Sequence, residues 1–320
     1  MPGQEPTDIV YTWVDDSFAG YREVLNRYVA DPRDTNPNRT RDNLNLIRYS
    51  LRSVARHMPW VRRIYFVSMR PQVPPWLNTD HPKLRVVHHD EIMDPAILPT
   101  FNSFAIVSHL HLLPGLSRRF FYIEDDMLAM SDLRDSYFAP DGRPYVHFKP
   151  RKVKAAAQLD AKHSSPWNLA LANASAALAD RFGGGPRNHV IHGPKLLDVK
   201  ACAAMCRDFA DLIETTRASR FRGTNNVPPE FLAPHYAVET GAAVRAPQAL
   251  SNRVQGYASL ENLTAWSRAQ LAWLALRKPH TLTLNDSFGD APNPRAEALI
   301  RARLNAWFPD PSPFETPAAN

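Results

Sequence analysis

The sequence predicts an α/β protein with a wound, mostly parallel sheet, followed by a half that is richer in helices. In residues 1–150, short apolar runs with strand preference alternate with segments of helical spacing, the pattern of parallel strands joined by helices. In residues 151–320, four longer segments have helical spacing and only one short strand is apparent. We expect the two halves to form one integrated domain.

Four strands and two helices are predicted in the first half. The strands span residues 8–14, 64–67, 84–87 and 120–123. The residues with the helical spacing of the first helix are Leu44, Ile47, Leu51, Val54 and Ala55. Asp42 or Asn43 is placed to cap this helix. Asn102 is placed to cap the second helix, which ends before Pro114-Gly115.

The second half is predicted to be mainly helical. Its helices span residues 167–181, 195–216, 263–277 and 295–307. A short strand at 281–284 lies between the last two helices and ends at Asn285-Asp286. Polar residues therefore follow this strand, as they follow the strand at 120–123.

Composition and charge narrow the function classes. The chain has 320 residues, 44% of them hydrophobic and 22% charged, which is ordinary for a soluble globular protein. The net charge of +6 and the pI near 9.4 suit an anionic ligand, an anionic polymer or an acidic membrane surface. The basic residues are scattered and no zinc-finger or RNA-recognition motif is present, so we expect no nucleic-acid partner.

The termini and the cysteines indicate a cytoplasmic protein. The first five residues have neither the basic nor the apolar region of a signal peptide. No stretch approaches the roughly 20 apolar residues that a membrane span needs. Cys202 and Cys206 lie four apart in a helical segment and are expected to be small core residues of a protein in a reducing compartment. At most, we expect peripheral contact with the inner face of the membrane.

The most informative motif is the acidic run that ends the strand at 120–123. Glu124, Asp125 and Asp126 follow four bulky residues directly. The carboxyl ends of parallel strands open onto the crevice where ligands bind, and paired carboxylates there hold a hard divalent cation. The alternative is a solvated acidic turn.

Two further groups suit a nucleotide. Thr12, Trp13 and Asp15 end the first strand, where an aromatic ring stacks on a base and a carboxylate binds a ribose hydroxyl; a core tryptophan beside a turn is the alternative. The residues around the first helix start are Arg39, Arg41, Asp42, Asn43 and Arg48. A helix N-terminus with guanidinium groups nearby is a phosphate site, and simple capping with surface arginines is the alternative.

Two histidines and an arginine complete the candidates. His189 and His192 lie three apart before a predicted helix, and either imidazole can accept a proton near neutral pH. The alternative is a pair of ordinary loop histidines, and no third residue at metal-ligand spacing supports a zinc site. Arg222, in the segment 220–226, is placed to balance the charge of a pyrophosphate.

The chain resembles the Stealth family of sugar-1-phosphate transferases, which includes bacterial capsule and exopolysaccharide phosphotransferases and the animal N-acetylglucosamine-1-phosphotransferase. Four motif regions of the family can be placed in order. They lie at residues 8–15, 41–126, 188–194 and, in two parts, 284–286 and 308–315. The chain departs from the family pattern at Asp16, where Gly is usual, at Glu124, where Asn is frequent, and at Val190-Ile191 between the histidines.

The resemblance implies a fold, a reaction and a site. The fold is a glycosyltransferase-A-like wound sheet, with a nucleotide-sugar-binding half at 1–150 and a half at 151–320 that completes the site. A sugar-1-phosphate passes from a nucleotide-sugar, UDP-N-acetylhexosamine or UDP-hexose, to a hydroxyl of a glycan or polymer acceptor. A phosphodiester forms and UMP leaves, in the synthesis of exopolysaccharide, capsule or cell-wall polymer.

Each candidate residue has an expected role in that reaction. Asp125 and Asp126, with Asn285 and Asp286, bind Mg²⁺ or Mn²⁺, while Glu124 lies outside the ligand set. His189 or His192 deprotonates the acceptor. Arg222, Arg41 and Arg48 contact the pyrophosphate. The remaining donor-binding residues are Thr12, Trp13, Asp15, Asp42, Asn43 and Asn102.

Two other functions remain open at this point. A metal-dependent glycosyltransferase uses the same fold, metal and donor but releases UDP. A non-catalytic protein that binds an anionic polymer is suggested by the basic pI.

Overall fold

A mostly parallel sheet forms the centre of the protein in the computed structural model, which describes residues 5–29, 42, 44–160, 162–289 and 291–316. Five strands make up this sheet: β1 (Thr7–Thr12), β2 (Ile64–Ser68), β3 (Leu84–His88), β4 (Arg119–Glu124) and β9 (Lys195–Asp198). Their order is β3-β2-β1-β4-β9. The first four strands are parallel, and β9 runs antiparallel to β4. The predicted fold class, an α/β wound sheet, is confirmed.

The order of the strands determines where a ligand site can form. The chain runs outward from β1 to β2 and β3, and then returns to place β4 on the other side of β1. β1 and β4 therefore flank the point where the winding reverses, and the crevice at their carboxyl ends is where open α/β sheets bind ligands.

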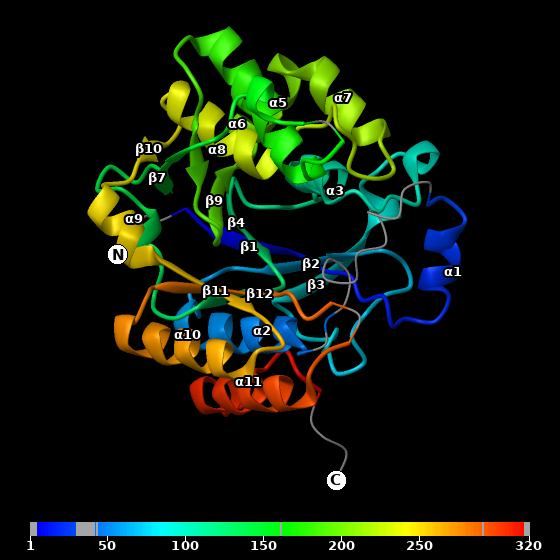
Figure 1. Ribbon diagram of the computed structural model, residues 1–320, viewed down its shortest axis with the longest axis vertical. Coiled ribbons are helices and arrows are strands. Elements are labelled where there is room, and N and C mark those ends of the chain that lie inside the picture. Colours follow the sequence, from blue (N-terminus) through cyan, green and yellow to red (C-terminus); the bar gives the residue numbers. More distant parts are fainter. Residues whose placement is uncertain (1–4, 30–41, 43, 161, 290, 317–320) are drawn as a thin grey trace.

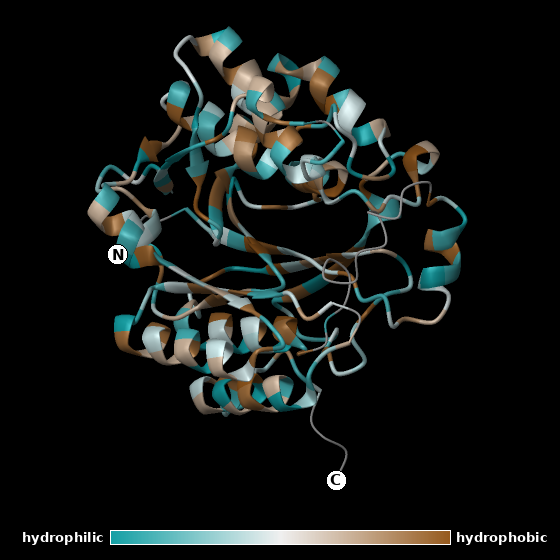
Figure 2. Ribbon diagram, in the orientation of Figure 1, coloured by the Kyte–Doolittle hydropathy of each residue, from teal (hydrophilic) through white to brown (hydrophobic). Residues whose placement is uncertain are grey.

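Helices cover both faces of the central sheet because its buried strands alternate their side chains between two cores (Figure 1). Val10 and Tyr122 face one core, which is covered by α3 (Ser103–His109), α5 (Pro166–Phe182), α6 (Val199–Asp208) and α8 (Pro229–Glu239). Ile9 and Ile123 face the other core, against α2 (Leu46–His57). Figure 2 shows the hydrophobic stretches along the central strands. Burial on both faces is typical of parallel sheets.

A second, smaller sheet lies beside α2. It consists of β11 (Gln255–Leu260), β12 (Thr281–Asp286) and β5 (Met127–Ala129), in that order. Two neighbouring helices, α10 (Thr264–Arg277) and α11 (Pro294–Trp307), pack on it and form the outermost layer in Figure 1. Because β5 follows β4 after a two-residue turn, this sheet and the central sheet meet at Asp125-Asp126.

Shorter elements complete the described part of the chain. These are α1 (Tyr21–Asn26), α4 (Arg134–Tyr137), α7 (Ala210–Ala218), α9 (Gln248–Val254), β6 (Tyr145–Val146), β7 (Phe148–Lys152), β8 (Asn188–Val190) and β10 (Val244–Arg245). β6 pairs with β10, and β7 pairs with β8. No described helix has the length and apolar character that crossing a bilayer requires.

One predicted helix was wrong at its start. The segment 195–216 was expected to be a single helix, but Lys195–Asp198 is β9, and two helices, α6 and α7, follow it. Leu196 and Leu197 give this strand an apolar run that pairs with the edge of β4. Asp198 then starts α6, because its carboxylate accepts the amides of Lys200 and Ala201. The second half thus contributes a strand to the central sheet.

Candidate functional site

A cavity of about 570 Å³ opens at the carboxyl ends of β1 and β4. This volume is within the range of small-ligand pockets. From the first half it is lined by Thr12, Trp13, Val14, Tyr21, Leu25, Met69, His89, Thr100, Phe101, Ser103, Ile106, Tyr122, Glu124, Asp125, Asp126 and Lys149. From the second half it is lined by Trp167, His192, Phe221, Arg222, Glu230, Tyr257 and Asn285.

The acidic run lies where the two sheets meet. Glu124 is the last residue of β4 and pairs in register with Thr12, the last residue of β1. Asp125 and Asp126 form the turn into β5. All three carboxylates line the cavity, so this run is part of the cavity wall and not a solvated surface turn.

Two nitrogen-bearing side chains from the second half approach these acids. The ammonium of Lys195, a buried residue of β9, donates to Glu124 Oε1 at 3.3 Å and to the carbonyl of Gly193 at 3.1 Å. His192 Nε2 lies 3.7 Å from Asp126 Oδ2. The His192 ring also meets the Tyr257 ring edge to face, with 6.1 Å between centroids. β9 brings Lys195 to the acids, and the turn before β9 brings His192 to them.

Burial and the neighbouring charged groups shift the pKa values of Glu124 and Asp125 in opposite directions. Burial by itself raises the pKa of Glu124, but Lys195 and His192 outweigh it and hold that pKa below its usual value. Burial and the carboxylate of Asp126 raise the pKa of Asp125 well above its usual value. Burial opposes charging of His192, but Glu124 and Asp126 outweigh it and raise the His192 pKa. Three carboxylates this close together are stabilised by a nearby positive charge.

The acids fit a divalent cation. One ligand atom each of Glu124, Asp126 and His192 lie within 4.8 Å of one another. Asp126 Oδ1 is buried and has no hydrogen-bond partner among the described residues. An unpartnered carboxylate oxygen beside a second carboxylate is a donor set that Mg²⁺ or Mn²⁺ accepts. Glu124, which we expected to lie outside the ligand set, belongs to this group, while Asp125 and Asp286 do not.

The structure distinguishes the two candidate histidines. His192 lines the cavity, whereas His189 lies in β8 and does not. Burial, Lys149 and Arg151 lower the pKa of His189, so its neighbours are cations, not the acids of the site. Of these two histidines, His192 is the one placed to act on a ligand in the cavity.

The residues expected on the nucleoside side divide into two sets. Thr12 and Trp13 line the cavity, and Thr12 Oγ1 lies 3.2 Å from the hydroxyl of Tyr122. The Trp13 indole donates to Asp42 Oδ2 at 3.4 Å. Asp15 does not line the cavity; its carboxylate accepts the amide of Ser17.

Asp42 supports the start of α2 as well as Trp13. Its Oδ1 accepts the amide of Leu46, the first residue of the helix, at 2.7 Å, although Asn45 is the residue at the N-cap position. Burial raises the pKa of Asp42 to about 6. Arg41 and Asn43, with Arg39, lie outside the described residues, so their expected roles stay predictions.

Three aromatic rings are in contact along the cavity wall. Tyr21 meets Phe101 edge to face at 5.8 Å between centroids, and Phe101 stacks on Phe221 at 5.1 Å with 15° between the ring planes. Arg222 lines the same cavity, donates to Ser103 Oγ at 2.6 Å and lies over the Phe104 ring. The cavity therefore combines an aromatic wall with a guanidinium group.

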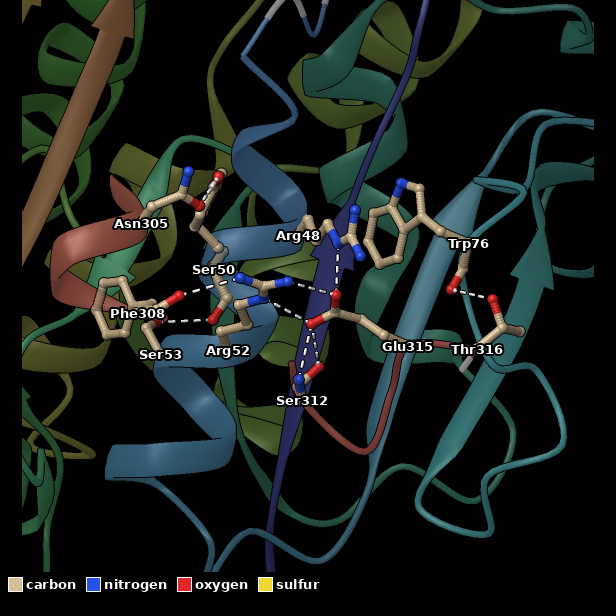
Figure 3. Close-up of polar contacts among 11 residues, drawn as sticks. Arg48, Ser50, Arg52, Ser53, Trp76, Asn305, Phe308, Ser312, Glu315 and Thr316 are labelled. Atoms are coloured by element: carbon tan, nitrogen blue, oxygen red, sulfur yellow. Dashed lines mark hydrogen bonds and ion pairs between the residues drawn. The ribbon is translucent and has the colours of Figure 1, made fainter. Parts of the chain in front are cut away.

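Arg48 does not line the cavity, and its expected role with pyrophosphate stays a prediction. Its guanidinium pairs with Glu315 and lies over the Trp76 ring (Figure 3). Glu315 also receives two hydrogen bonds from Arg52, at 2.7 and 2.8 Å. Two motif residues that the sequence singled out separately are thus partners, and together they attach the C-terminal segment to α2.

Asn102 likewise does not line the cavity, and its expected donor-binding role stays a prediction. It is fully buried, its side-chain oxygen caps α3 at the Phe104 amide, and its amide group donates to Asn226 Oδ1 at 2.9 Å. Asn285 lines the cavity as expected, whereas the Asp286 carboxylate accepts the amide of Phe288 and does not line it.

Several lining residues were not anticipated from the sequence. These are Ser103, Lys149, Trp167, Glu230 and Tyr257, together with Lys195 beside the acids. Only Lys195 gave a local signal, since it follows His192-Gly193-Pro194 directly. The others come from distant segments that the fold brings together.

Two conserved regions of one family match the chain. Stealth protein CR2, conserved region 2, matches residues 39–145, and Stealth protein CR3, conserved region 3, matches residues 191–239. The first contains the acidic run, and the second contains His192 and Arg222 but not His189. The second motif region of the sequence analysis is thereby confirmed and the third only at residues 191–194, while the first and fourth stay predictions.

Curated relatives are similar over nearly the whole chain. Exopolysaccharide phosphotransferase SCO2594 of Streptomyces coelicolor is 37% identical over 97% of this chain and 51% of its own length. Exopolysaccharide phosphotransferase CpsY of Mycobacterium tuberculosis is 32% identical over 98% of this chain and 58% of its own length. The chain thus spans about half the length of these relatives.

Solved structures that resemble the chain are glycosyltransferases. The galactosyltransferase LgtC has a TM-score of 0.42 and 10% identity, with 95% of this chain and 96% of LgtC covered. The glycosyltransferase GlyE of Streptococcus pneumoniae has a TM-score of 0.41 and 12% identity, with 96% of this chain and 65% of GlyE covered.

Proposed function

This chain belongs to the Stealth family, and from that premise we propose that it transfers a sugar-1-phosphate from a nucleotide-sugar to a hydroxyl group. The donor is a UDP-N-acetylhexosamine or UDP-hexose, and the acceptor is a glycan or polymer. The products are a phosphodiester and UMP, in the synthesis of exopolysaccharide, capsule or cell-wall polymer. The observation that carries this proposal is the Asp126 Oδ1 atom, which has no hydrogen-bond partner among the described residues and lies beside Glu124 and His192 in a ligand-sized cavity.

The aromatic wall is the proposed nucleoside end of the cavity. The rings of Trp13, Tyr21 and Phe101 offer faces and edges on which a base packs. The hydroxyl of Thr12 and the carboxylate of Asp42 lie beside Trp13 and suit ribose hydroxyls.

The acids and cations are the proposed diphosphate end. Glu124 and Asp126, with Asp125 adjacent, hold Mg²⁺ or Mn²⁺, and the cation when bound neutralises diphosphate oxygens. The guanidinium of Arg222 supplies a further positive charge on the same cavity. Phosphoryl transfer depends mainly on holding and neutralising these oxygens, so this combination suits the reaction.

His192 is the proposed proton acceptor. The acceptor oxygen forms a bond to the phosphorus next to the sugar, and its proton passes to His192 Nε2. The bond from that phosphorus to the bridging oxygen breaks, and UMP leaves. The Nε2 lone pair cannot hold a cation and accept a proton at once, so we assign the cation to the carboxylates.

The test is to incubate the protein with UDP-sugars, neutral oligosaccharide acceptors and Mg²⁺ or Mn²⁺, and to identify the nucleotide released. We expect UMP, and loss of at least about 100-fold in turnover for Asp126→Asn, because its carboxylate charge is gone. Asp132→Asn is the control, since Asp132 pairs with Arg134 on the surface. Release of UDP would identify a glycosyltransferase. Polymer binding that survives in Asp126→Asn, without turnover in the wild type, would identify a binding protein.

Peripheral membrane contact is proposed through the outer face of α10. The large apolar residues exposed there are Leu263, Trp266, Trp273 and Leu276, between 50% and 80% exposed. No acidic residue occurs from Thr264 to Lys278, where Arg268, Arg277 and Lys278 are basic. Tryptophan and leucine beside basic residues suit the interface of a bilayer with anionic lipids.

A further inference from the structure

Glu230 is a buried acid in the cavity that the proposed reaction does not use. It lies in the first turn of α8, opposite the strand ends, and its carboxyl group lines the cavity. The residue is only 6% exposed. α8 enters the cavity wall at this point because Pro228-Pro229 starts the helix directly after the segment that carries Arg222.

One carboxyl oxygen of Glu230 lacks a hydrogen-bond partner. Its Oε2 is buried, and no hydrogen bond from the described residues reaches it. Leaving a buried polar oxygen without a hydrogen bond costs free energy. An unpaired carboxyl oxygen at a cavity wall therefore indicates that a ligand supplies the missing hydrogen bond. The helix N-terminus favours negative charge there but supplies no hydrogen bond to Oε2.

The surroundings of Glu230 favour a neutral hydrogen-bond donor. Burial and the carboxylate of Glu124 raise the pKa of Glu230 to about 7, whereas Lys195 and Arg222 act in the opposite direction. These two cations already offset the acids beside them, so the position does not call for another cation. A hydroxyl group is a neutral donor that a carboxyl oxygen accepts in either protonation state.

The wall beside Glu230 has the mixed character of a sugar site. Trp167 of α5 lines the same cavity, and α5 packs against α8. The guanidinium of Arg222 lies 5.9 Å from the centroid of the Trp167 ring. An aromatic surface with a few fixed polar groups is how small-molecule sites orient a ring that carries hydroxyl groups.

We infer that Glu230 forms a sugar subsite, in which its carboxyl group accepts hydrogen bonds from the hydroxyls of a sugar ring packed near Trp167. The inference rests on the proposed function for the presence of a sugar in the cavity. That sugar belongs either to the donor or to the acceptor, and both offer the same hydroxyl chemistry.

Binding measurements test the subsite without requiring turnover. Affinities of UMP, UDP-N-acetylglucosamine and UDP-glucose for the wild type, Glu230→Leu and Glu230→Gln are measured by calorimetry with Mg²⁺. Chitobiose and maltose are then titrated into protein saturated with UMP. For a donor subsite, Glu230→Leu weakens UDP-sugar binding about 10- to 100-fold and leaves UMP binding unchanged. For an acceptor subsite, only disaccharide binding weakens by that factor. Glu230→Gln, which keeps one acceptor oxygen, gives a smaller loss in either case.

The matched control is Glu239→Gln, at the far end of the same helix. Glu239 pairs with Arg187 at 2.8 Å and does not line the cavity, so its substitution leaves all these affinities unchanged. Melting temperatures should not fall in either Glu230 variant, because burial and the carboxylate of Glu124 disfavour the charged form of Glu230 in the wild type. The inference is overturned if sugar affinities of both Glu230 variants stay within twofold of the wild type, or if the wild type binds neither disaccharide and binds neither UDP-sugar more tightly than UMP. Sugar-dependent binding with release of UDP would contradict the proposed function while leaving the subsite in place.

Discussion

His192 and His189 lie three positions apart in the sequence but face different groups in the structure. The strand β8 keeps His189 among the basic residues Lys149 and Arg151. The turn between β8 and β9 places His192 Nε2 near Asp126 and in the cavity. The sequence could indicate a histidine pair, but the choice between them depends on the strand that follows, which we predicted as helix.

Substituting the two histidines separately tests this difference. His192→Gln should lower kcat about 10²- to 10⁴-fold, because the proton acceptor is removed. Mn²⁺ affinity, measured by electron paramagnetic resonance, should stay close to that of the wild type, because the carboxylates hold the cation. His189→Gln should change neither quantity.

Two results would contradict the assignment. Loss of Mn²⁺ binding in His192→Gln would make this residue a metal ligand. A larger fall in kcat for His189→Gln than for His192→Gln would place the proton acceptor in β8.

At the scale of elements, α2 is held by the C-terminal segment. Glu315 pairs with Arg48 and Arg52 on α2 and accepts the backbone amide of Ser312 at 2.7 Å (Figure 3). Thr316 donates its amide to the carbonyl of Trp76 at 2.8 Å. The sequence pointed to the motif at 308–315 but not to this contact, since nothing local relates residues more than 250 positions apart.

This contact predicts a specific dependence of stability on pH. Burial by itself raises the pKa of Glu315, but hydrogen bonds from Arg52, Ser312 and Arg48 outweigh it and lower that pKa from 4.5 to about 2. Because the pKa of Glu315 is lower in the folded state than in the unfolded state, its carboxylate adds to the free energy of unfolding above pH 4.5. This contribution is lost as the pH falls toward 2. It amounts to at most about 3 kcal/mol.

Glu315→Gln should therefore lower the free energy of unfolding at pH 7 by about 2 to 3 kcal/mol. The difference from the wild type should narrow between pH 4.5 and 2, as followed by urea unfolding. The control is Glu214→Gln, on the exposed side of α7. A Glu315→Gln loss that does not change with pH would show that the charge of Glu315 is not what stabilises the segment.

At the scale of the whole molecule, the sequence predicted the wound sheet because its buried strands are continuous apolar runs. Strands β1 to β4 each begin or end within two residues of their predicted positions, and polar residues mark the carboxyl ends of β1 and β4. The cavity was less accessible to sequence reasoning. Trp167 and Glu230 line it from helices, and only the packing of α5 and α8 over the sheet brings them to the acids.

The exposed apolar residues on the outer face of α10 predict that the whole protein binds lipid vesicles. The protein should sediment with vesicles that contain anionic lipid, and less so with vesicles of neutral lipid alone. Trp266→Ser with Trp273→Ser should abolish this binding, while turnover with soluble substrates stays unchanged, because both residues lie away from the cavity. Equal binding of the double variant, or none by the wild type, would exclude this face as a membrane contact.

The most direct test of the proposed reaction is the phosphorus content of the acceptor product. Sugar-1-phosphate transfer moves the sugar and its phosphorus together, so ³¹P NMR of the purified product should show one phosphodiester resonance, with one UMP released per product. A product that contains the added sugar without phosphorus, with UDP as the by-product, would show that the sugar–oxygen bond is broken instead and would contradict the proposed function.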